Sequence, residues 1–584
     1  VLVVSAAMPA AVEAAPLLKI KQVDSSPNGV YIVQMLDEPA VAYTGGIAGL
    51  KATAPREGTK INPLNKDVVN YTRYLVGKHD QALKKAGGQK LYDYTFSFNG
   101  FAAKMNANQA RKMAALDSVK VVYADELQTM DTSSTPTFLG LDAENGLWAQ
   151  LGGFKNAGEG IIIGVIDSGI WPESLSFTDR DANGKLVFQQ IPGWHGKCTP
   201  GENFVASQCN QKLIGAQWFN AGWGGNKGID ANMPWEFTSA RDYNGHGTHT
   251  SSTAGGNHGV QATGPAAAFG SISGMAPRAR IAMYKALWST QDASTANGYT
   301  SDLVAAIDRA VADGVDVINY SISGSLTNFL DPVMVSFLYA ARAGVFVSAS
   351  AGNSGPTTST VAHPGPWVTT VAAGTHNRSM LGTVEMGDGM LYTGVSTSTS
   401  EVTAPLIDSI NAGLPGADPT QVALCYSSLD GGNVLDPAKV AGKIVVCDRG
   451  VTARVNKSLA VKEAGGVGLV LVNPSSASLN ADFHSVPTVH LQNTDYAAVH
   501  AYAALEGATA TIFKAEVDLN TPAPFTASFS SRGPLLAGNG DLLKPDVMAP
   551  GQDILAAVSP VGNGGMDFNL YSGTSMSAPH VAGV

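Results

Sequence analysis

Short apolar runs and amphipathic helices alternate along residues 28–128. The pattern predicts a strand at Val30–Met35, a polar helix near residues 65–86, two strands between Leu91 and Met105 that turn at Asn99-Gly100, a helix at Ala107–Leu116 and a strand at Val119–Tyr123. The order β-α-β-β-α-β is typical of a ferredoxin-like α+β domain. The polar run Asp131–Pro136 that follows indicates an exposed linker.

From about residue 157 the pattern changes to continuous apolar strands separated by helices. The predicted strands are Ile161–Ile166, Ile281–Tyr284, Val315–Asn319 and Val345–Ser348, with helical spacing over Asp302–Ala312. Strands without polar positions are covered on both faces, which predicts an α/β domain with a parallel sheet. Functional residues of such sheets gather beyond the carboxyl ends of the strands.

Residues 385–515 interrupt this domain with a strand-rich pattern of their own. It includes strands at Gly442–Cys447 and Gly465–Val472 and a helix-like stretch at Val461–Ala464. The α/β motifs resume at Ser528–Pro534, so we interpret residues 385–515 as an inserted β-rich domain.

The 584 residues carry a net charge of −10, and only 14% of them are charged. So low a charged fraction excludes a coiled coil, extended disorder and nucleic-acid binding through a basic surface. No apolar run of ~20 residues lies away from the start, so no membrane span is predicted. Residues 1–15 combine the end of an apolar region with small residues near Ala14, which indicates a residual signal peptide and a secreted protein. A short buried helix is the alternative.

Four cysteines agree with secretion. Cys198 lies near Cys209 and Cys425 near Cys447, and two local disulfides are the simplest of three connectivities. Neither pair has the CxxC spacing of a zinc site.

Four polar residues stand where a strand or helix is predicted to begin or end. Asp167 follows a buried strand, His246 lies between glycines, Asn353 follows another strand in a glycine-bracketed loop, and Ser575 opens a helix after Gly573. Each alone has an ordinary explanation: a turn aspartate, a structural histidine, a turn amide and an N-cap serine. Together, in the order Asp, His, Asn, Ser, these residues form a combination that is specific where each alone is not.

Two incomplete motifs could indicate a metal site. His246 and His249 are three residues apart, but no HExxH motif or downstream carboxylate accompanies them. Residues Asp179–Gly184 fit the start of a calcium loop, but Gln190 stands where the bidentate Glu belongs, so a turn is favoured. We expect no metal and no cofactor.

Four segments match one known family: Gly164–Ser174, Arg241–Thr250, Phe529–Pro534 and Lys544–Val547. From about residue 28 onward the chain resembles the subtilisin-like serine peptidases, or subtilases, of the cucumisin type. After the residual signal peptide at 1–15, the resemblance implies an inhibitor propeptide at 28–128, a linker and mature N-terminus at 129–156, a catalytic domain at 157–384 and 516–584, and a protease-associated domain at 385–515. The second catalytic part is expected to be truncated, because the sequence stops nine residues after Ser575.

The resemblance also implies a role for each site residue. Ser575 is the nucleophile, His246 the general base, Asp167 the group that orients it, and Asn353 an oxyanion donor. Ser321, Ile322, Ser323 and Gly324 resemble the strand that pairs with an extended peptide substrate. Ala351, Gly352 and Ala362 resemble the wall of the pocket for the residue before the scissile bond, and their small size admits a large apolar or aromatic side chain.

The expected function is therefore that of a secreted serine endopeptidase, made as a self-processed zymogen, which hydrolyses proteins or peptides through an acyl-enzyme. Its propeptide would act as folding chaperone and intramolecular inhibitor, with processing around Met130–Thr132. The inserted domain would contribute to substrate access or dimer contacts, which leaves a homodimer open. The alternatives are a sedolisin-type peptidase with an acidic base, and a non-catalytic binding protein that retains the fold.

Overall fold

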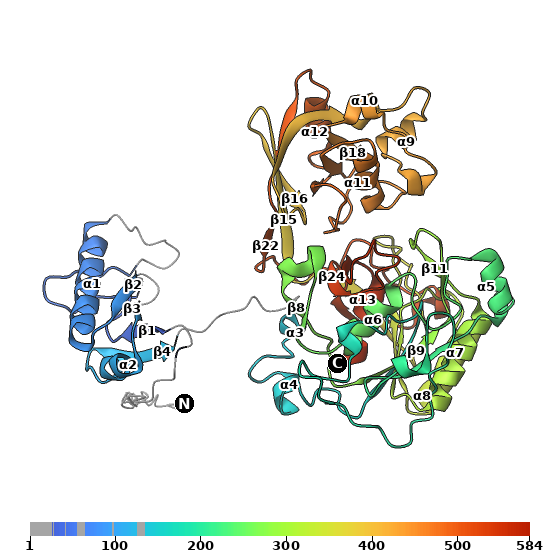
Figure 1. The fold of residues 1–584 in the computed structure, drawn as a ribbon, viewed down its shortest axis with the longest axis horizontal. Coiled ribbons are helices and arrows are strands. Elements are labelled where there is room, and N and C mark those ends of the chain that lie inside the picture. The colour runs from blue at the N-terminus through green and yellow to red at the C-terminus, as the bar shows by residue number, and fades with distance from the viewer. Residues whose placement is uncertain (1–25, 27–28, 41, 55–64, 96–98, 125–134) are drawn as a thin grey trace, which may run out of the picture. The chain divides into compact units, whose positions relative to one another are not determined.

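The computed structural model describes residue 26 and residues 29–40, 42–54, 65–95, 99–124 and 135–584 (Figure 1). The chain divides into two compact units, Val1–Thr129 and Met130–Val584. The expected signal peptide at 1–15 and the expected processing segment Met130–Thr132 lie outside the described residues. Within the described ranges, no helix has the length and hydropathy needed to cross a membrane.

The first unit confirms the predicted β-α-β-β-α-β order. Its elements are β1 (Val30–Met35), α1 (Lys66–Ala86), β2 (Gln89–Tyr94), β3 (Gly100–Lys104), α2 (Ala107–Ala114) and β4 (Val119–Ala124). The strands form one sheet in the order β2-β3-β1-β4, and all three pairings are antiparallel. This is the ferredoxin-like arrangement, in which two helices cover one sheet.

The turn predicted at Asn99-Gly100 is misplaced. Gly100 already belongs to β3, where it pairs with Tyr94 and Gln34. Asn99 is buried; its Oδ1 lies 2.8 Å from His79 Nε2, and its Nδ2 donates to the Asp37 carbonyl at 2.7 Å. The Asn99 amide therefore satisfies buried polar groups, a demand that the local sequence does not show.

The second unit contains the predicted parallel sheet. Its strands lie in the order β23-β14-β13-β12-β5-β9-β6, and every pairing is parallel. The bounds are β5 (Ile162–Asp167), β6 (Leu213–Trp218), β9 (Arg280–Lys285), β12 (Val317–Tyr320), β13 (Phe346–Ser350), β14 (Thr369–Gly374) and β23 (Val547–Pro550). All four predicted strands are present, and β6, β14 and β23 are additional.

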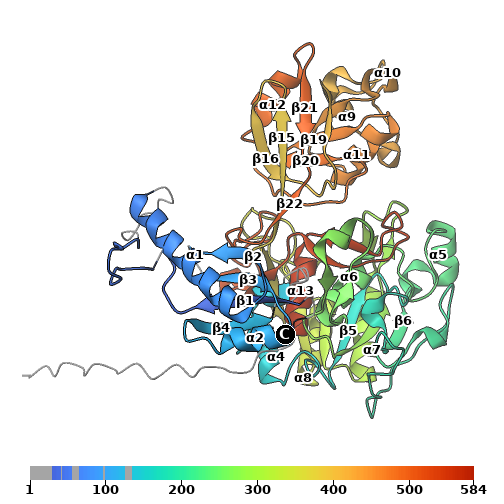
Figure 2. The same cartoon turned by 60° about the vertical axis from the view of Figure 1, so that its left-hand side comes forward.

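Helices cover both faces of this sheet (Figure 2). Ile162 and Ile166 of β5 pack in the core with α7 (Thr300–Asp313) and α8 (Pro332–Arg342). Ile163 and Val165 face the other core, which contains Ala254 of α6 (His246–Gly255) and Ala582 of α13 (Thr574–Gly583). Alternate residues of β5 thus pack into two different cores, one on each face of the sheet. This explains why the apolar pattern of β5 is continuous.

Shorter elements complete this part of the unit. They are α3 (Thr135–Phe138), α4 (Leu147–Gln150), α5 (Asn226–Asn232), β7 (Val260–Gln261), β8 (Ser271–Ile272), β10 (Trp288–Ser289), β11 (Ala296–Asn297), β24 (Ile554–Ala557) and β25 (Phe568–Tyr571).

A second, mixed sheet lies between β14 and β23 in the chain. Its strands are β15 (Ser379–Met386), β16 (Leu391–Val395), β17 (Val402–Asp408), β18 (Ile444–Asp448), β19 (Gly468–Val472), β20 (Thr488–Leu491), β21 (Thr509–Ile512) and β22 (Glu516–Asp518). Helices α9 (Pro419–Ala423), α10 (Pro437–Val440), α11 (Arg454–Glu463) and α12 (Tyr496–Ala503) accompany it. Its core is separate from the cores of the parallel sheet, so we call residues 379–518 the inserted domain.

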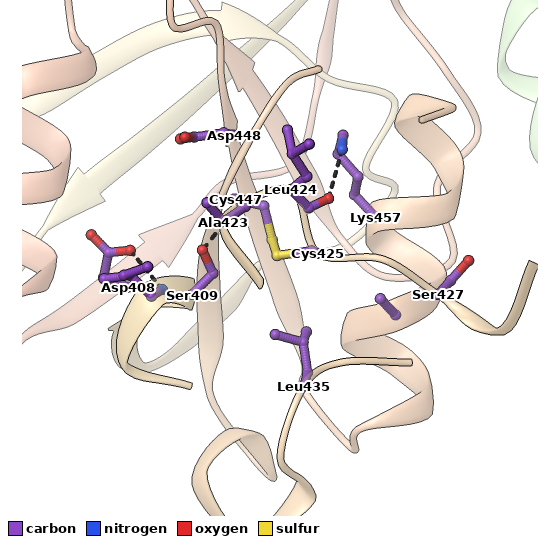
Figure 3. The surroundings of a disulfide bond; sticks show 12 residues. Asp408, Ser409, Ala423, Leu424, Cys425, Ser427, Leu435, Cys447, Asp448 and Lys457 are labelled. Atoms are coloured by element: carbon purple, nitrogen blue, oxygen red, sulfur yellow. Dashed lines mark hydrogen bonds between the residues drawn. A yellow bond between two sulfur atoms is a disulfide. The ribbon is translucent and has the colours of Figure 1, made fainter. Parts of the chain in front are cut away.

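Both disulfides join cysteines that are close in sequence, as the spacing predicts: Cys198 with Cys209, and Cys425 with Cys447. Figure 3 shows the second, which ties the segment after α9 to strand β18. Beside it, Lys457 Nζ donates to the Leu424 carbonyl at 2.6 Å. The bond and the buried ammonium group together hold this segment against the sheet.

A charged cluster lies at the carboxyl ends of β17 and β18. His500 Nδ1 is 2.7 Å from Asp408 Oδ2, and His500 Nε2 is 3.1 Å from Asp448 Oδ1. Burial lowers the pKa of His500, but its hydrogen bonds to Asp408 and Asp448 and the charges of both carboxylates outweigh this and raise the pKa to about 9. His500 is therefore a cation at neutral pH that joins α12 to two strands.

We expect His500→Gln to destabilise the inserted domain in a pH-dependent way. Because the folded-state pKa lies above the ordinary value of 6.5, the stabilisation is complete below pH 6.5 and is lost as pH rises through about 9. The variant should melt about 3–6 °C below the wild type at pH 6 and close to it at pH 9.5. Thermal unfolding at both pH values measures this, with the exposed His195→Gln as control. An equal deficit at both pH values would contradict the electrostatic explanation.

Candidate active site

Asp167 and His246 form a hydrogen-bonded pair at the carboxyl end of the parallel sheet. Asp167 is the last residue of β5 and is fully buried, and His246 is the first residue of α6. His246 Nδ1 lies 2.7 Å from Asp167 Oδ1, while Thr250 Oγ1 donates to Asp167 Oδ2 at 3.1 Å. Because a carboxylate only accepts, Nδ1 carries the proton and Nε2 of the neutral ring is left to accept one.

Two carboxylates control the protonation of His246. Burial lowers its pKa, but the charge and hydrogen bond of Asp167 and the charge of Asp242 outweigh this, and the net pKa is raised above the ordinary value. The two carboxylates therefore stabilise the protonated form of His246, the imidazolium. A histidine that acts as a general base becomes an imidazolium when it takes a proton.

Asp242 is a positioning residue that the spacing of the motifs did not reveal. Its Oδ1 accepts from Ser168 Oγ at 3.0 Å and from the Gly245 N–H at 2.9 Å. Its Oδ2 accepts from the N–H and the hydroxyl of Thr248, at 3.0 and 2.6 Å. One buried carboxylate thus clamps the loop after Asp167 to the first turn of the helix that carries His246. Asp242 lies inside Arg241–Thr250, one of the segments that resemble the family. Its positioning role is visible only from its contacts in the structure.

Ser575 is the second residue of α13, where the first N–H groups of a helix lack intrahelical partners. Its Oγ donates to the Ser321 carbonyl at 3.2 Å, and Ser321 Oγ donates to the Ser575 carbonyl at 2.8 Å. Pro579, four residues on in the same helix, has no N–H for that carbonyl. The missing N–H leaves the Ser575 carbonyl free to accept the hydrogen bond from Ser321, the residue that follows β12.

Asn353 is held by its oxygen, which leaves its nitrogen available. Asn353 Oδ1 accepts from the Thr574 N–H at 2.8 Å and from the Thr574 hydroxyl at 2.9 Å. A backbone N–H can only donate, so this contact assigns Oδ1 and Nδ2 of the amide. Thr574 Oγ1 also accepts from the Gly352 N–H at 3.1 Å, which fixes the loop after β13 to the N-terminus of α13.

A cavity of about 590 Å³ brings these residues together. Its wall includes His246, Asn353 and Ser575. Arg454, Asp482 and Phe483 of the inserted domain line another part of its wall. A serine hydroxyl, a histidine with an oriented carboxylate and a fixed amide donor around one cavity are the components of acyl transfer.

The other predicted site residues lie beside this constellation. Ser321, Ile322, Ser323 and Gly324 follow β12 directly, at the same edge of the sheet. Ala351 and Gly352 follow β13, and the Ala362 N–H donates to the Ala351 carbonyl at 2.9 Å. Both alanines are buried.

The two motifs weighed as metal ligands have other partners. His249 is buried and its Nε2 lies 2.8 Å from the Ile554 carbonyl, so it does not share a site with His246. Asp181 Oδ1 accepts from the N–H groups of Asn183 and Lys185, at 2.9 and 3.0 Å, which forms the predicted turn. Across the described ranges, no three His, Cys, Asp or Glu side chains are grouped as metal ligands.

Comparison with known proteins yields two family matches and several relatives. Residues 30–131 match the Peptidase inhibitor I9 family. Subtilisin-like protease SBT1.6 of Arabidopsis thaliana is 41% identical over 513 residues, which are 84% of this chain and 64% of the relative. For SBT1.7 of the same plant the identity is 38% over 526 residues, 87% of this chain and 66% of the relative. The chain thus spans about two thirds of the length of these curated relatives.

Solved structures also align with the chain. Sphericase shares 17% sequence identity over 78% of this chain and 83% of its own, with a TM-score of 0.32. S41 Psychrophilic Protease shares 19% sequence identity over 73% of this chain and 76% of its own, with a TM-score of 0.30. The decisive match is that of residues 158–584, which contain Asp167, His246, Asn353 and Ser575, to the model of the Subtilase family. This chain belongs to the subtilase family.

Proposed function

We propose that the protein is a serine endopeptidase that cleaves proteins or peptides through an acyl-enzyme. The observation that carries the proposal is the 2.7 Å contact between His246 and Asp167, in a histidine that lines one cavity with Ser575 and Asn353. The family match and the relatives named subtilisin-like proteases support it.

In this mechanism Ser575 Oγ turns from the Ser321 carbonyl toward His246 Nε2. His246 accepts its proton while the oxygen attacks the scissile carbonyl carbon, and Asp167 stabilises the imidazolium. The negative oxygen of the tetrahedral intermediate receives hydrogen bonds from Asn353 Nδ2 and the Ser575 N–H. His246 then protonates the leaving amine, and water, activated by the same histidine, hydrolyses the acyl-enzyme.

Substrate recognition would follow the backbone of an extended peptide. Ser321, Ile322, Ser323 and Gly324 would pair with it as an added strand. Small side chains at Ala351, Gly352 and Ala362 would admit a large apolar or aromatic residue before the scissile bond. A cleavage profile on a peptide library measures this preference.

We propose further that the protein is secreted and made as a self-processed zymogen. The inhibitor-family match at residues 30–131 supports the assignment of residues 28–128 as propeptide, cut around Met130–Thr132. Residues 385–515 would be a protease-associated domain inserted between catalytic parts 157–384 and 516–584. A homodimer through this domain stays a prediction, which analytical ultracentrifugation tests.

A fluorophosphonate probe distinguishes the enzyme from a binding protein that retains the fold. We expect it to label Ser575, because the reagent needs a serine hydroxyl activated by a base. The matched control is Ser577→Ala, which removes a buried hydroxyl from the same helix. Labelling should persist in that variant and vanish in Ser575→Ala. A folded wild-type protein that does not react would favour the binding protein.

The pH dependence of activity should report His246. Because its pKa is raised, kcat/KM should increase through an apparent pKa above the ordinary value of 6.5 and stay high in mild alkali. Initial rates between pH 4 and 10, with folding monitored by circular dichroism, measure the profile. A maximum below about pH 5 would instead favour an acidic base, as in the sedolisin-type alternative.

A further inference from the structure

Hydrogen bonds join the inserted domain to the loop that leads into α13. They begin at Asn480, which lies between β19 and β20 and is 2% exposed. Asn480 Nδ2 donates to Ser572 Oγ at 2.8 Å and to Asp553 Oδ1 at 3.3 Å. A carboxylate oxygen only accepts, so the contact with Asp553 identifies this atom of the amide as the nitrogen. We call the contacts among Asn480, Asp553 and Ser572 the interdomain link.

The sheet of the inserted domain fixes the position of Asn480. Asn480 Oδ1 accepts from the Ser478 hydroxyl at 2.7 Å, and the Asn480 N–H donates to His490 Nδ1 of β20 at 3.4 Å. Since Nδ1 of this histidine accepts, its Nε2 carries the proton and donates to Asn473 Oδ1, directly after β19, at 2.8 Å. Two strands of the inserted domain therefore determine where the Asn480 amide lies.

Asp553 connects this amide to the residues before the nucleophile. Its Oδ1 accepts from Ser572 Oγ at 3.0 Å, and its N–H donates to the same hydroxyl at 2.8 Å. Asp553 has a φ of 54°, a conformation that costs free energy in a residue other than glycine, so its surroundings must hold it. Arg378, directly before β15, donates to the Asp553 carbonyl. Gln552 Nε2 donates to the Leu479 carbonyl at 2.9 Å, which makes a further contact with the inserted domain.

The loop that contains Asp553 packs against the first turn of α13 without free space. The Gly573 N–H donates to the Gly551 carbonyl at 2.7 Å. A Cβ at Gly551 would lie 2.1 Å from Ser577 Oγ and 2.9 Å from the Gly573 carbonyl, far inside van der Waals contact. Because packed groups cannot move independently, a displacement of this loop displaces the turn that carries Ser575.

We propose that Asn480 is a positioning residue for the reaction at Ser575, through which the inserted domain fixes the first turn of α13. The proposal rests on the proposed peptidase function and assigns a further residue to it. Asn480 is buried, so its effect reaches the substrate only through Ser572, Asp553 and the helix. A displacement of about 1 Å in a reacting group can lower a rate by 10²-fold, so a remote contact of this kind is enough to change kcat.

Asp553 is the member of the interdomain link that titrates. Burial and the charge of Asp482 raise its pKa to about 6, so it is an anion at pH 8. Burial disfavours both charges of the Arg454–Asp482 pair, but their mutual attraction outweighs it, which lowers the pKa of Asp482 and raises that of Arg454. Burial also lowers the pKa of four neighbouring groups, none of which changes charge between pH 6 and 8.5: Arg378 to about 10, His484 to about 4, and His376 and His490 to about 3.

The first test is Asn480→Ala, measured at pH 8. Loss of the amide should lower kcat about 10- to 100-fold and leave KM within about twofold, because the nucleophile is displaced while the substrate sites remain. The rate at which a fluorophosphonate labels Ser575 should fall in parallel, since this reaction needs no bound peptide. The matched control is Asn433→Ala, which removes an amide that donates to the Ala460 carbonyl within the inserted domain at 3.0 Å and should keep both rates.

The second test is Asn480→Asp, a variant of nearly the same size. A second carboxylate beside Asp553 raises the upper pKa of the pair, so at pH 6 the two share a proton and an O–H replaces the lost amide donor. At pH 8.5 both are ionised and repel each other. The ratio of kcat in this variant to kcat in the wild type, in which the titration of His246 cancels, should therefore decrease between pH 6 and 8.5. The same ratio for Asn480→Ala should stay constant.

Circular dichroism confirms folding in each case, and the outcomes separate the two proposals. Unchanged kcat and labelling in folded Asn480→Ala, or an increase in KM alone, overturns the positioning role. A constant ratio for Asn480→Asp overturns it as well, and this comparison decides the matter if Asn480→Ala does not fold. A folded wild-type protein that neither cleaves peptides nor reacts with the probe overturns the proposed peptidase function, and the role of Asn480 with it.

Discussion

Replacing Ser575 by alanine is expected to abolish peptide hydrolysis and propeptide release together. The same hydroxyl performs both reactions in the proposed mechanism, and the substitution removes the attacking atom while the Asp167–His246 pair stays in place. In a subtilisin, loss of the nucleophile lowers kcat by about 10⁶-fold, and a decrease of this order is expected here. The helix should tolerate the change, because alanine is the best helix former.

Two measurements on purified protein test this prediction. Steady-state hydrolysis of a peptide substrate gives the loss in kcat, and intact mass spectrometry shows whether residues before about Met130 remain attached. Ser577→Ala should process normally, because its hydroxyl lies on the same helix but is buried away from the reaction. Correct processing of Ser575→Ala in the absence of any other protease would show that maturation does not depend on this serine.

Replacing Asn353 by leucine should lower kcat by about 10²–10³-fold and change KM little. The range is the one measured for the oxyanion asparagine of a subtilisin. The Asn353 amide gains its hydrogen bond mainly when the substrate oxygen becomes negative, so its loss affects the transition state more than the resting complex. Leucine has nearly the same volume and keeps the loop filled. Single-turnover and steady-state kinetics, with folding checked by circular dichroism, measure both constants.

Leucine also removes the acceptor that Thr574 uses at the start of α13. Asn353→Asp is therefore the matched control, because aspartate keeps an oxygen for Thr574 but replaces the donor with a negatively charged acceptor that repels an oxyanion. If Nδ2 serves the oxyanion, both variants lose kcat. If Asn353→Asp were active and only Asn353→Leu impaired, the residue would anchor the helix instead. A higher KM with unchanged kcat would make Asn353 a substrate-positioning residue.

The inserted domain gives the cavity around Ser575 part of its wall. Arg454 pairs with Asp482 through its Nη2 at 3.0 Å, and both side chains line the cavity that also contains His246. The parallel sheet supplies the residues proposed for chemistry, while the insertion restricts the space in front of them.

Much of the secondary structure follows from the residue pattern. Strand β1 covers the predicted residues Val30–Met35, and the continuous apolar strands β5, β9, β12 and β13 appear as predicted. Hydrophobic period and helix-capping residues are local properties, so a single sequence displays them. The turn at Asn99-Gly100 was misplaced because Asn99 is held by His79 and Asp37, and both are distant in the chain.

The sequence by itself determined the alternation of elements and the four residues Asp167, His246, Asn353 and Ser575, because each stands at the end of an element within a recognisable segment. Only the tertiary structure decided what these residues contact. The sheet order places β5, β12 and β13 side by side, which brings together residues hundreds of positions apart. The clamp of Asp242 and the bond between Ser321 and the carbonyl left free by Pro579 both depend on that order. Hydrogen bonding between distant side chains requires their positions in space, and a local pattern of hydrophobic and polar residues does not contain them.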